Sequence, residues 1–161
     1  MNPFSRHCGM MTGNHAQANL CEPLAQLKRE HGTLRKQMDR FAKDAAEIGA
    51  REQADWSREL HALKEKVGAF VRELDPHSER EEKFLFPLMA KYIGREVGPI
   101  AVMEYEHELA KEHLKKFALE AEQMEKPADA ARAKEIAVYA IQAHSVLTEH
   151  FMKEENVLFP M

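Results

Sequence analysis

The sequence predicts an all-α protein, an up-down-up-down four-helix bundle, and three observations carry this prediction. Apolar residues recur at alternating steps of three and four along four stretches, as they do on the buried face of a helix. Only seven glycines and seven prolines occur in 161 residues, and several of them separate these stretches. No stretch alternates apolar and polar residues in the manner of a strand. Four such helices, joined by short turns, bury their apolar faces in a bundle.

The length and composition fit one globular domain. Charged residues make up 31% of the chain and hydrophobic residues 44%, and 161 residues are enough to bury a full-sized core. The first part of the chain, which includes Gly9 and Gly13, has no sustained periodicity. We therefore expect a flexible N-terminal arm over residues 1–22 and a bundle over residues 23–161.

The first predicted helix follows Pro23, and Gly49 is its expected stop. Its apolar face carries Leu24, Leu27, His31, Leu34, Met38, Phe41, Ala45 and Ile48. The second helix is the longest, and Pro76 inside it should cause a kink, because proline removes one backbone hydrogen bond. Its face carries Trp56, Leu60, Leu63, Val67, Phe70, Leu74, His77, Glu81, Phe84 and Leu88.

The third predicted helix begins near Pro99, a residue suited to a first helical turn, and Pro127 marks the break after it. Its apolar face carries Ile100, Met103, His107, Ala110, Leu114, Phe117 and Met124. The fourth helix completes the bundle, and its face carries Ile136, Ala140, Ala143, Leu147, His150, Glu154, Val157 and Leu158.

Polar residues interrupt these apolar faces at matching places. One histidine occupies a core position on each helix, and one glutamate continues the core face of the second and of the fourth helix: His31, His77, His107, His150, Glu81 and Glu154. A carboxylate in an apolar interior is unfavourable unless it is paired or bound to a cation. Four imidazoles and two carboxylates that converge in one bundle therefore predict a metal site.

The pattern H-x-x-x-E-E-x-x-L-F-P occurs twice, beginning at His77 and at His150. In a helix, His77 and Glu81 lie one turn apart on one face, so both can reach one metal. A His–Glu pair repeated in two halves of a helical bundle is how such folds build a carboxylate centre for two metals. The similar spacings of the histidines in the two halves predict a pseudo-twofold arrangement of the ligands.

Simpler interpretations exist for each residue. A single buried histidine is more often a satisfied core residue than a ligand, and a purely structural bundle is the corresponding alternative for the whole chain. His61, His113 and His144 lie away from the predicted site and are expected to be surface or packing residues. The second glutamates of the repeat, Glu82 and Glu155, are either solvated charges, which we favour, or acceptors that orient an imidazole.

Other features exclude some classes of partner. The net charge is −4, with no basic block, which argues against nucleic acid, and no long apolar run or leader suggests a membrane span or export signal. Two cysteines are too few for a disulfide framework, which fits a cytoplasmic protein. A separate metal site in the arm, using His7, Cys8, His15 and Cys21, is a weak hypothesis, because their spacing is not that of a zinc site.

These residues resemble the pattern of the hemerythrin-like family, the HHE cation-binding domains: H…H-x-x-x-E…H…H-x-x-x-E. It is met over residues 24–161 by His31, His77 with Glu81, His107, and His150 with Glu154. The resemblance implies a non-haem di-iron centre. The two glutamates would bridge the irons together with an oxo or hydroxo group, the histidines would fill terminal positions, and zinc or manganese are possible substitutes.

The chain departs from oxygen-carrying hemerythrins in two places. They have an H-x-x-x-H pair on the third helix, where this chain has Lys111, and a final H-x-x-x-x-D, where it offers Glu154 or Glu155. With fewer histidines the centre should be more open, which argues against a reversible oxygen carrier. The chain is also similar to the bundle part of the nitric-oxide-responsive iron–sulfur repair proteins, which carry an additional N-terminal domain and a further histidine.

Two classes of function follow. The leading hypothesis is a di-iron module that binds or senses oxygen, nitric oxide or iron. The alternative is an enzyme that consumes peroxide or nitric oxide, or a donor of iron in iron–sulfur cluster repair. In either case the partner is a small molecule or an ion, and candidates to line its pocket are Phe84, Leu85, Met103 and Leu147.

Overall fold

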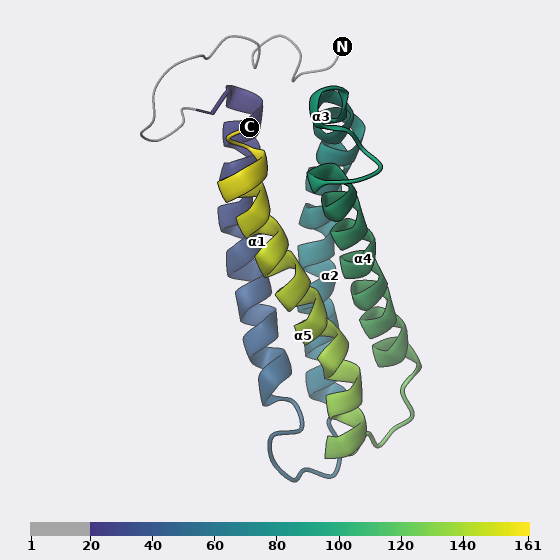
Figure 1. Ribbon diagram of the computed structural model, residues 1–161. Coiled ribbons are helices and arrows are strands. Elements are labelled where there is room, and N and C mark those ends of the chain that lie inside the picture. Colours follow the sequence, from purple (N-terminus) through teal and green to yellow (C-terminus); the bar gives the residue numbers. More distant parts are fainter. Residues whose placement is uncertain (1–19) are drawn as a thin grey trace.

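Four long antiparallel helices form the bundle in the computed structural model, which describes residues 20–161 (Figure 1). They are α1 (Glu22–Glu47), α2 (Ser57–Arg80), α4 (Pro99–Gln123) and α5 (Ala130–Lys153). Contacts join α1 to α2, α2 to α4, α4 to α5 and α5 back to α1, so the helices close a ring. The predicted four-helix bundle is confirmed. None of the helices in the described part of the chain is long and apolar enough to cross a membrane.

The helices α2 and α5 each continue into one π-helical turn. These turns are η1 (Glu81–Leu85), which leads into the short helix α3 (Phe86–Ile93), and η2 (Glu154–Leu158). Each is closed by the N–H of a phenylalanine, which donates to the carbonyl five residues back. A proline follows each phenylalanine and lacks the N–H that a regular α-helix needs, so the wider turn fits the repeated L-F-P ending.

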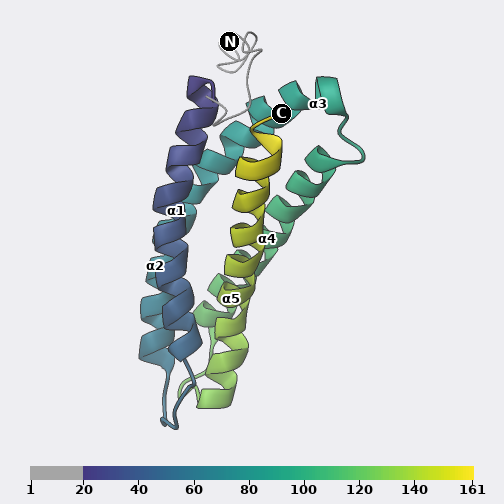
Figure 2. The same ribbon diagram turned by 60° about the vertical axis from the view of Figure 1, so that its left-hand side comes forward.

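Pro76 does not interrupt α2, which continues as an α-helix to Arg80. The kink that we expected at Pro76 stays a prediction, and the change to π-helical hydrogen bonding begins at Glu81, the first residue of η1. Beyond η1 the chain turns across the end of the bundle through α3 (Figure 2). This change in hydrogen bonding therefore falls on a predicted ligand.

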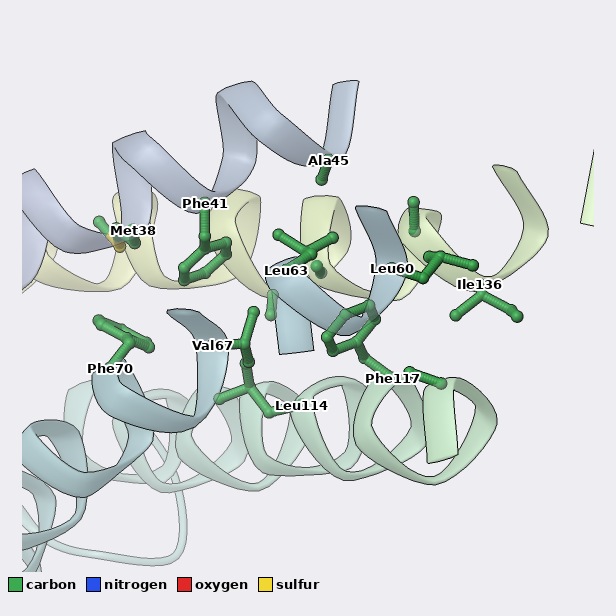
Figure 3. Packing of buried hydrophobic residues seen from close by; sticks show 14 of the residues in the cluster. Met38, Phe41, Ala45, Leu60, Leu63, Val67, Phe70, Leu114, Phe117 and Ile136 are labelled. Atoms are coloured by element: carbon green, nitrogen blue, oxygen red, sulfur yellow. The ribbon is translucent and has the colours of Figure 1, made fainter. Parts of the chain in front are cut away.

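The buried apolar side chains form two separate clusters. The larger fills most of the bundle, where, for example, the rings of Phe41 and Phe70 meet edge to face with centroids 5.2 Å apart (Figure 3). The smaller lies near α3 and consists of Leu27, Leu85, Phe86, Ile100, Met103, Leu158 and Phe159. On α1, α2 and α4 the predicted ligands fall between the residues of one cluster and those of the other, and on α5 they lie where the larger cluster ends, beside Phe151. A polar layer therefore divides the core.

At the other end of the bundle, hydrogen bonds join the loop between α1 and α2 to the loop between α4 and α5. The Trp56 N–H donates to the carbonyl of Ala128 at 2.8 Å, and the carboxylate of Asp55 accepts from the N–H groups of Ser57 and Ala128. The helix α1 ends at Glu47, close to the predicted stop, and Gly49 takes a φ of 75°. The division of the chain into an arm over residues 1–22 and a bundle stays a prediction, because residues 1–19 lie outside the described part.

Candidate metal centre

Six buried side chains meet in the polar layer, in two overlapping groups. Within each group the ligand atoms lie within 4.8 Å of one another. Position A comprises His31 and His77, position B comprises His107 and His150, and both positions share Glu81 and Glu154. The structure thus brings together all six residues that the sequence singled out, in the pseudo-twofold arrangement that the repeat indicates.

Local helix geometry places each ligand in this layer. His77 and Glu81 are one helical turn apart, and so are His150 and Glu154, so each pair points from one helix face into the bundle. Each glutamate is the first residue of its π-helical turn. Single π-helical turns inside α-helices occur frequently at functional sites. The His–Glu pair and the L-F-P ending, the two strongest sequence signals, therefore belong to one local structure: the π-helical turn that begins at the glutamate and ends at the phenylalanine.

The histidines of each position aim at a common point. The Nε2 atoms of His31 and His77 are 3.1 Å apart, and those of His107 and His150 are 2.9 Å apart. Two nitrogen ligands at roughly 2.1 Å from one ion, and about at right angles, would themselves be separated by about 3 Å. The spacing within each pair is therefore that of two ligands of a single ion.

Each of the two carboxylates faces both positions. Glu81 places Oε1 at 2.8 Å from Nε2 of His77 and Oε2 at 3.0 Å from Nε2 of His107. Glu154 pairs through Oε1 with His150, and its Oε2 lies 3.9 Å from Nε2 of His31. Because each glutamate turns one oxygen to each position, both are oriented as bridges between two ions.

The oxygens of these two glutamates lack compensation from hydrogen bonds. Both side chains are fully buried, and none of their four oxygens has a hydrogen-bond partner among the described residues. The nearby imidazole nitrogens face these oxygens without forming hydrogen bonds to them, and a buried carboxylate that lacks hydrogen bonds is commonly stabilised by a bound cation. The orphaned oxygens and the paired imidazoles together fit a metal centre.

The pKa values of Glu81 and Glu154 reflect how close these two buried carboxylates lie to each other. Burial and the negative charge of Glu81 raise the pKa of Glu154 well above its usual range. Burial also acts to raise the pKa of Glu81, but the neighbouring side chains of Glu154, His107 and His150 outweigh it and hold that pKa well below its usual range. Two carboxylates in one buried site do not both stay charged, so one of them holds a proton until a cation arrives.

A second ring of four glutamates surrounds the ligands. Every ligand histidine uses Nδ1 to contact one of them: His31 with Glu155 at 3.2 Å, His77 with Glu30 at 2.7 Å, His107 with Glu82 at 2.8 Å, and His150 with Glu106 at 3.4 Å. A carboxylate that accepts a hydrogen bond from one ring N–H keeps the proton on that nitrogen and leaves the other nitrogen free to bind metal. The outer glutamates thus fix both the orientation and the tautomer of each imidazole.

Our preferred interpretation of Glu82 and Glu155 as solvated charges is wrong. Each contacts a ligand histidine of the other half of the molecule, Glu82 reaching His107 and Glu155 reaching His31. Sequence reasoning also missed Glu30 and Glu106. The signal was present, because an E-H dipeptide precedes each half of the repeat at residues 30–31 and 106–107.

Four basic side chains complete this ring, one for each outer glutamate. Arg35 pairs with Glu155, Arg80 with Glu30, Lys111 with Glu82, and Lys153 with Glu106. Lys111 stands where oxygen-carrying hemerythrins have a further histidine, and its Nζ lies 3.4 Å from Glu82. The side chain at that position therefore supports an outer glutamate and adds no imidazole ligand.

The apolar surroundings come from both clusters. Leu85 and Met103 are buried in the smaller cluster and Phe84 packs against it, whereas Leu147 belongs to the larger one.

The remaining histidines lie outside the site. His61, His113 and His144 belong to neither metal group, and His144 instead contacts Asp39 at 2.8 Å. The weak arm site cannot be placed, because His7, Cys8 and His15 lie outside the described residues.

The fold and site define a four-helix bundle protein with a buried His–Glu cluster that fits a metal centre. The Hemerythrin HHE cation binding domain matches residues 22–161. The chain belongs to this family, as the resemblance in its motifs indicated. The buried cluster fits the carboxylate-bridged two-metal site that the repeat predicted.

Several curated relatives carry the same printed name. The chain is 32% identical over 137 residues to the iron-sulfur cluster repair protein YtfE of Musicola paradisiaca (strain Ech703), covering 83% of this chain and 61% of that protein. It is 32% identical over 134 residues to YtfE of Enterobacter sp. (strain 638), covering 82% of this chain and 60% of the relative. The chain thus spans about three fifths of the length of these relatives. No solved structure matches it.

Proposed function

We propose that this chain is a non-haem di-iron protein that binds or senses oxygen, nitric oxide or iron. In this proposal the metal ligands are His31, His77, His107, His150, Glu81 and Glu154. The observation that carries it is the orientation of the two glutamates, each of which turns one oxygen toward each histidine pair. A site for one ion would not need two carboxylates that each face both positions.

Iron is the metal that the donor set and the family favour. Imidazole and carboxylate ligands together suit iron, and they also suit zinc and manganese, so availability and geometry decide between these metals. When bound, two ferrous ions with few protein ligands each supply open positions for a diatomic molecule or peroxide. A reducing cytoplasm, where ferrous iron persists, is the compartment that we propose.

The side chains around the site have distinct tasks in this proposal. Glu81 and Glu154 would hold two ions side by side, and the outer glutamates accept hydrogen bonds from the Nδ1–H groups of the histidines. Leu85 and Met103, which belong to the smaller cluster, and Leu147, which belongs to the larger, would line the centre on its two sides. Because these three side chains are almost fully buried, they keep bulk water away from the centre.

A second candidate function is the donation of iron in iron–sulfur cluster repair. The printed name of the relatives favours it, and 82–83% of this chain aligns with them. Their additional length has no counterpart in the match, so this activity is a proposal for the chain. An enzyme that consumes nitric oxide or peroxide is the third possibility, and turnover of these molecules by the iron-loaded protein would distinguish it.

The test of the proposed function begins with metal content. The protein loaded anaerobically with ferrous iron should retain two irons per chain, and His77→Ala or Glu81→Ala should abolish loading. His144→Ala is the matched control, because His144 is a histidine of α5 outside both positions. A Glu81→Ala variant that still holds two irons would refute the ligand assignment.

Optical spectra then separate the functions. A band that forms when oxygen or nitric oxide is admitted, and disappears when the gas is removed, identifies a reversible binder. Irreversible oxidation points to redox turnover or to iron handling. Transfer of iron to a cluster-free iron–sulfur protein, faster than from free ferrous iron at equal concentration, would support the repair function.

A further inference from the structure

The two metal positions have different surroundings. The repeat makes His31 of position A the counterpart of His107 of position B. Their outer glutamates, Glu155 and Glu82, are likewise counterparts, but the basic residue that holds the glutamate is an arginine in one case and a lysine in the other. The same change occurs for the second histidine of each position, which is supported through Arg80 in position A and Lys153 in position B.

The first difference is in how firmly the outer carboxylate is held. Arg35 donates two hydrogen bonds to Glu155, at 2.9 Å to Oε1 and 2.6 Å to Oε2. Lys111 makes one contact to Glu82, at 3.4 Å. A guanidinium fork fixes a carboxylate in one plane, whereas an ammonium group is a mobile point charge on a flexible chain. Glu155 is therefore more rigidly placed than Glu82, although Nδ1 of His107 lies closer to its glutamate.

The second difference is in the cover over the histidine. The ring of His31 stacks against Phe151, with centroids 4.2 Å apart, and against Phe159 at 5.8 Å. Within residues 20–161, His107 has one phenylalanine neighbour, Phe86, at 5.3 Å in a tilted arrangement. The repeat puts Ser78 at the position that corresponds to Phe151. Position B thus lacks the aromatic ring that lies against the counterpart histidine in position A.

The third difference is in access from solvent. His31 is fully buried and the side chain of Glu155 is 13% exposed, whereas His107 is 4% exposed and the side chain of Glu82 is 32% exposed. A partly solvated carboxylate can move away from its histidine with little loss, because water replaces the contact. At the first histidine of each position all three differences weaken the support of position B relative to that of position A. At the second histidine only the exchange of arginine for lysine does so, because Glu30 of position A is 24% exposed and Glu106 of position B is 10% exposed.

We propose that the two metal positions are functionally distinct: the ion held by His107 and His150 exchanges with solvent, and the ion held by His31 and His77 is retained. This inference rests on the proposed function and deepens it. It assigns Lys111, Glu82 and Ser78 as the residues that make position B labile, and Arg35, Glu155 and Phe151 as those that make release from position A slow. If the chain donates iron, the ion at position B is the one that leaves.

The test is the release of ferrous iron to a chelator. The full chain is loaded anaerobically with two irons, mixed with excess bipyridine, and followed by the colour of the chelate and by the metal that remains on the protein. We expect two phases, each of one iron per chain. Release of both irons in a single phase would overturn the inference while leaving the proposed function intact, whereas failure to load two irons would contradict the proposed function itself.

Matched variants assign the phases to positions. Glu82→Gln should speed the fast phase by about 10-fold and leave the slow phase unchanged, and Glu155→Gln should speed the slow phase by a similar factor. The charge-preserving exchanges Lys111→Arg and Arg35→Lys should act oppositely, the first slowing the fast phase and the second speeding the slow phase. The inference fails if the Glu82 and Glu155 variants change the same phase. Circular dichroism of each variant verifies that the bundle is folded.

Discussion

Each ligand histidine has its two ring nitrogens assigned to different tasks. Nδ1 contacts an outer glutamate, and Nε2 faces Glu81, Glu154 or both. In the metal-free protein the effect of these carboxylates differs between the rings, because burial outweighs them at His31 and lowers its pKa, whereas the pKa of His150 is raised well above its usual range. For His77, burial acts to lower the pKa, but the carboxylates of Glu30 and Glu81 outweigh it and raise the pKa to about 9.

This pKa predicts how the stability of the metal-free protein depends on pH. The folded-state pKa of His77 exceeds the ordinary value of 6.5, so the stability that its proton provides is present below pH 6.5 and is lost as the pH rises through about 9. The raised pKa values of His150 and Glu154 act in the same direction. We expect the free energy of unfolding to fall by up to roughly 3 kcal/mol over this range for His77 alone.

Urea unfolding of chelator-treated protein at pH 6.5 and pH 9 measures this change. His77→Gln should flatten the dependence, because the side chain no longer titrates. Metal binding should show the opposite trend, since the ligand nitrogens must lose their protons before they bind, so metal affinity should rise with pH. Metal-free protein that gains stability between pH 6.5 and pH 9 would contradict the prediction.

At the scale of residues, the sequence predicted the inner ligands but not all of their supports. His31 and Glu81 stood out because a polar group on an apolar face needs a special partner. Glu30 did not stand out, because a glutamate on a helix is ordinarily solvated. Its contact with His77 depends on how α1 and α2 are aligned along the bundle. The periodicity of apolar residues within one helix gives no information about that alignment.

Among the elements, the two π-helical turns are the feature least visible in the sequence. The apolar period predicted each long helix, and Pro99 and Pro127 marked boundaries close to those observed. The period cannot distinguish an i→i+4 from an i→i+5 hydrogen bond over a single turn. The repeated L-F-P ending was the available signal, and it was interpreted only as the termination of a helix.

The end of α1 offers a test of backbone geometry at the scale of elements. Gly49 has a φ of 75°, and a Cβ atom there would lie 2.7 Å from the carbonyl oxygen of Ala130. Gly49→Ala should therefore lower the free energy of unfolding by about 1–2 kcal/mol from the strained φ alone, and by more if the neighbouring loop cannot move. Denaturant unfolding of the metal-free protein measures the loss.

Gly32 is the matched control for this substitution. It lies inside α1, and no atom lies within 4 Å of an added Cβ. Gly32→Ala should raise the free energy of unfolding by roughly 0.5–1 kcal/mol, because alanine loses less backbone entropy in a helix. If both alanine variants destabilised the protein equally, the geometric explanation for Gly49 would be wrong.

At the scale of the whole molecule, the metal layer separates two apolar clusters and joins all four long helices. Metal binding should therefore stabilise the entire bundle. With free metal at 1,000 times Kd, each site adds about 4 kcal/mol, so Tm should rise by at least about 10 °C. Calorimetry with and without chelator measures the change, and the double variant Glu81→Ala and Glu154→Ala should show none. An unchanged Tm in the natural protein would instead support a purely structural bundle.

The sequence repeat predicted which residues are equivalent but not which of them touch. Glu30 and Glu106 contact histidines of their own half, whereas Glu82 and Glu155 contact those of the other half. Both patterns are compatible with the same spacing along the chain. The choice between them is made by the packing of α1 on α5 and of α2 on α4, which is tertiary information.

This crossing of contacts has a consequence for dissecting the molecule. A single helical hairpin such as residues 20–93 would have both histidines of one position but only one of the two bridging glutamates, and His31 would lack Glu155. Neither hairpin is thus a complete metalloprotein by itself. Two identical hairpins related by a twofold axis would supply one another's missing glutamates, so the minimal symmetric version of this centre is a homodimer rather than a shortened chain.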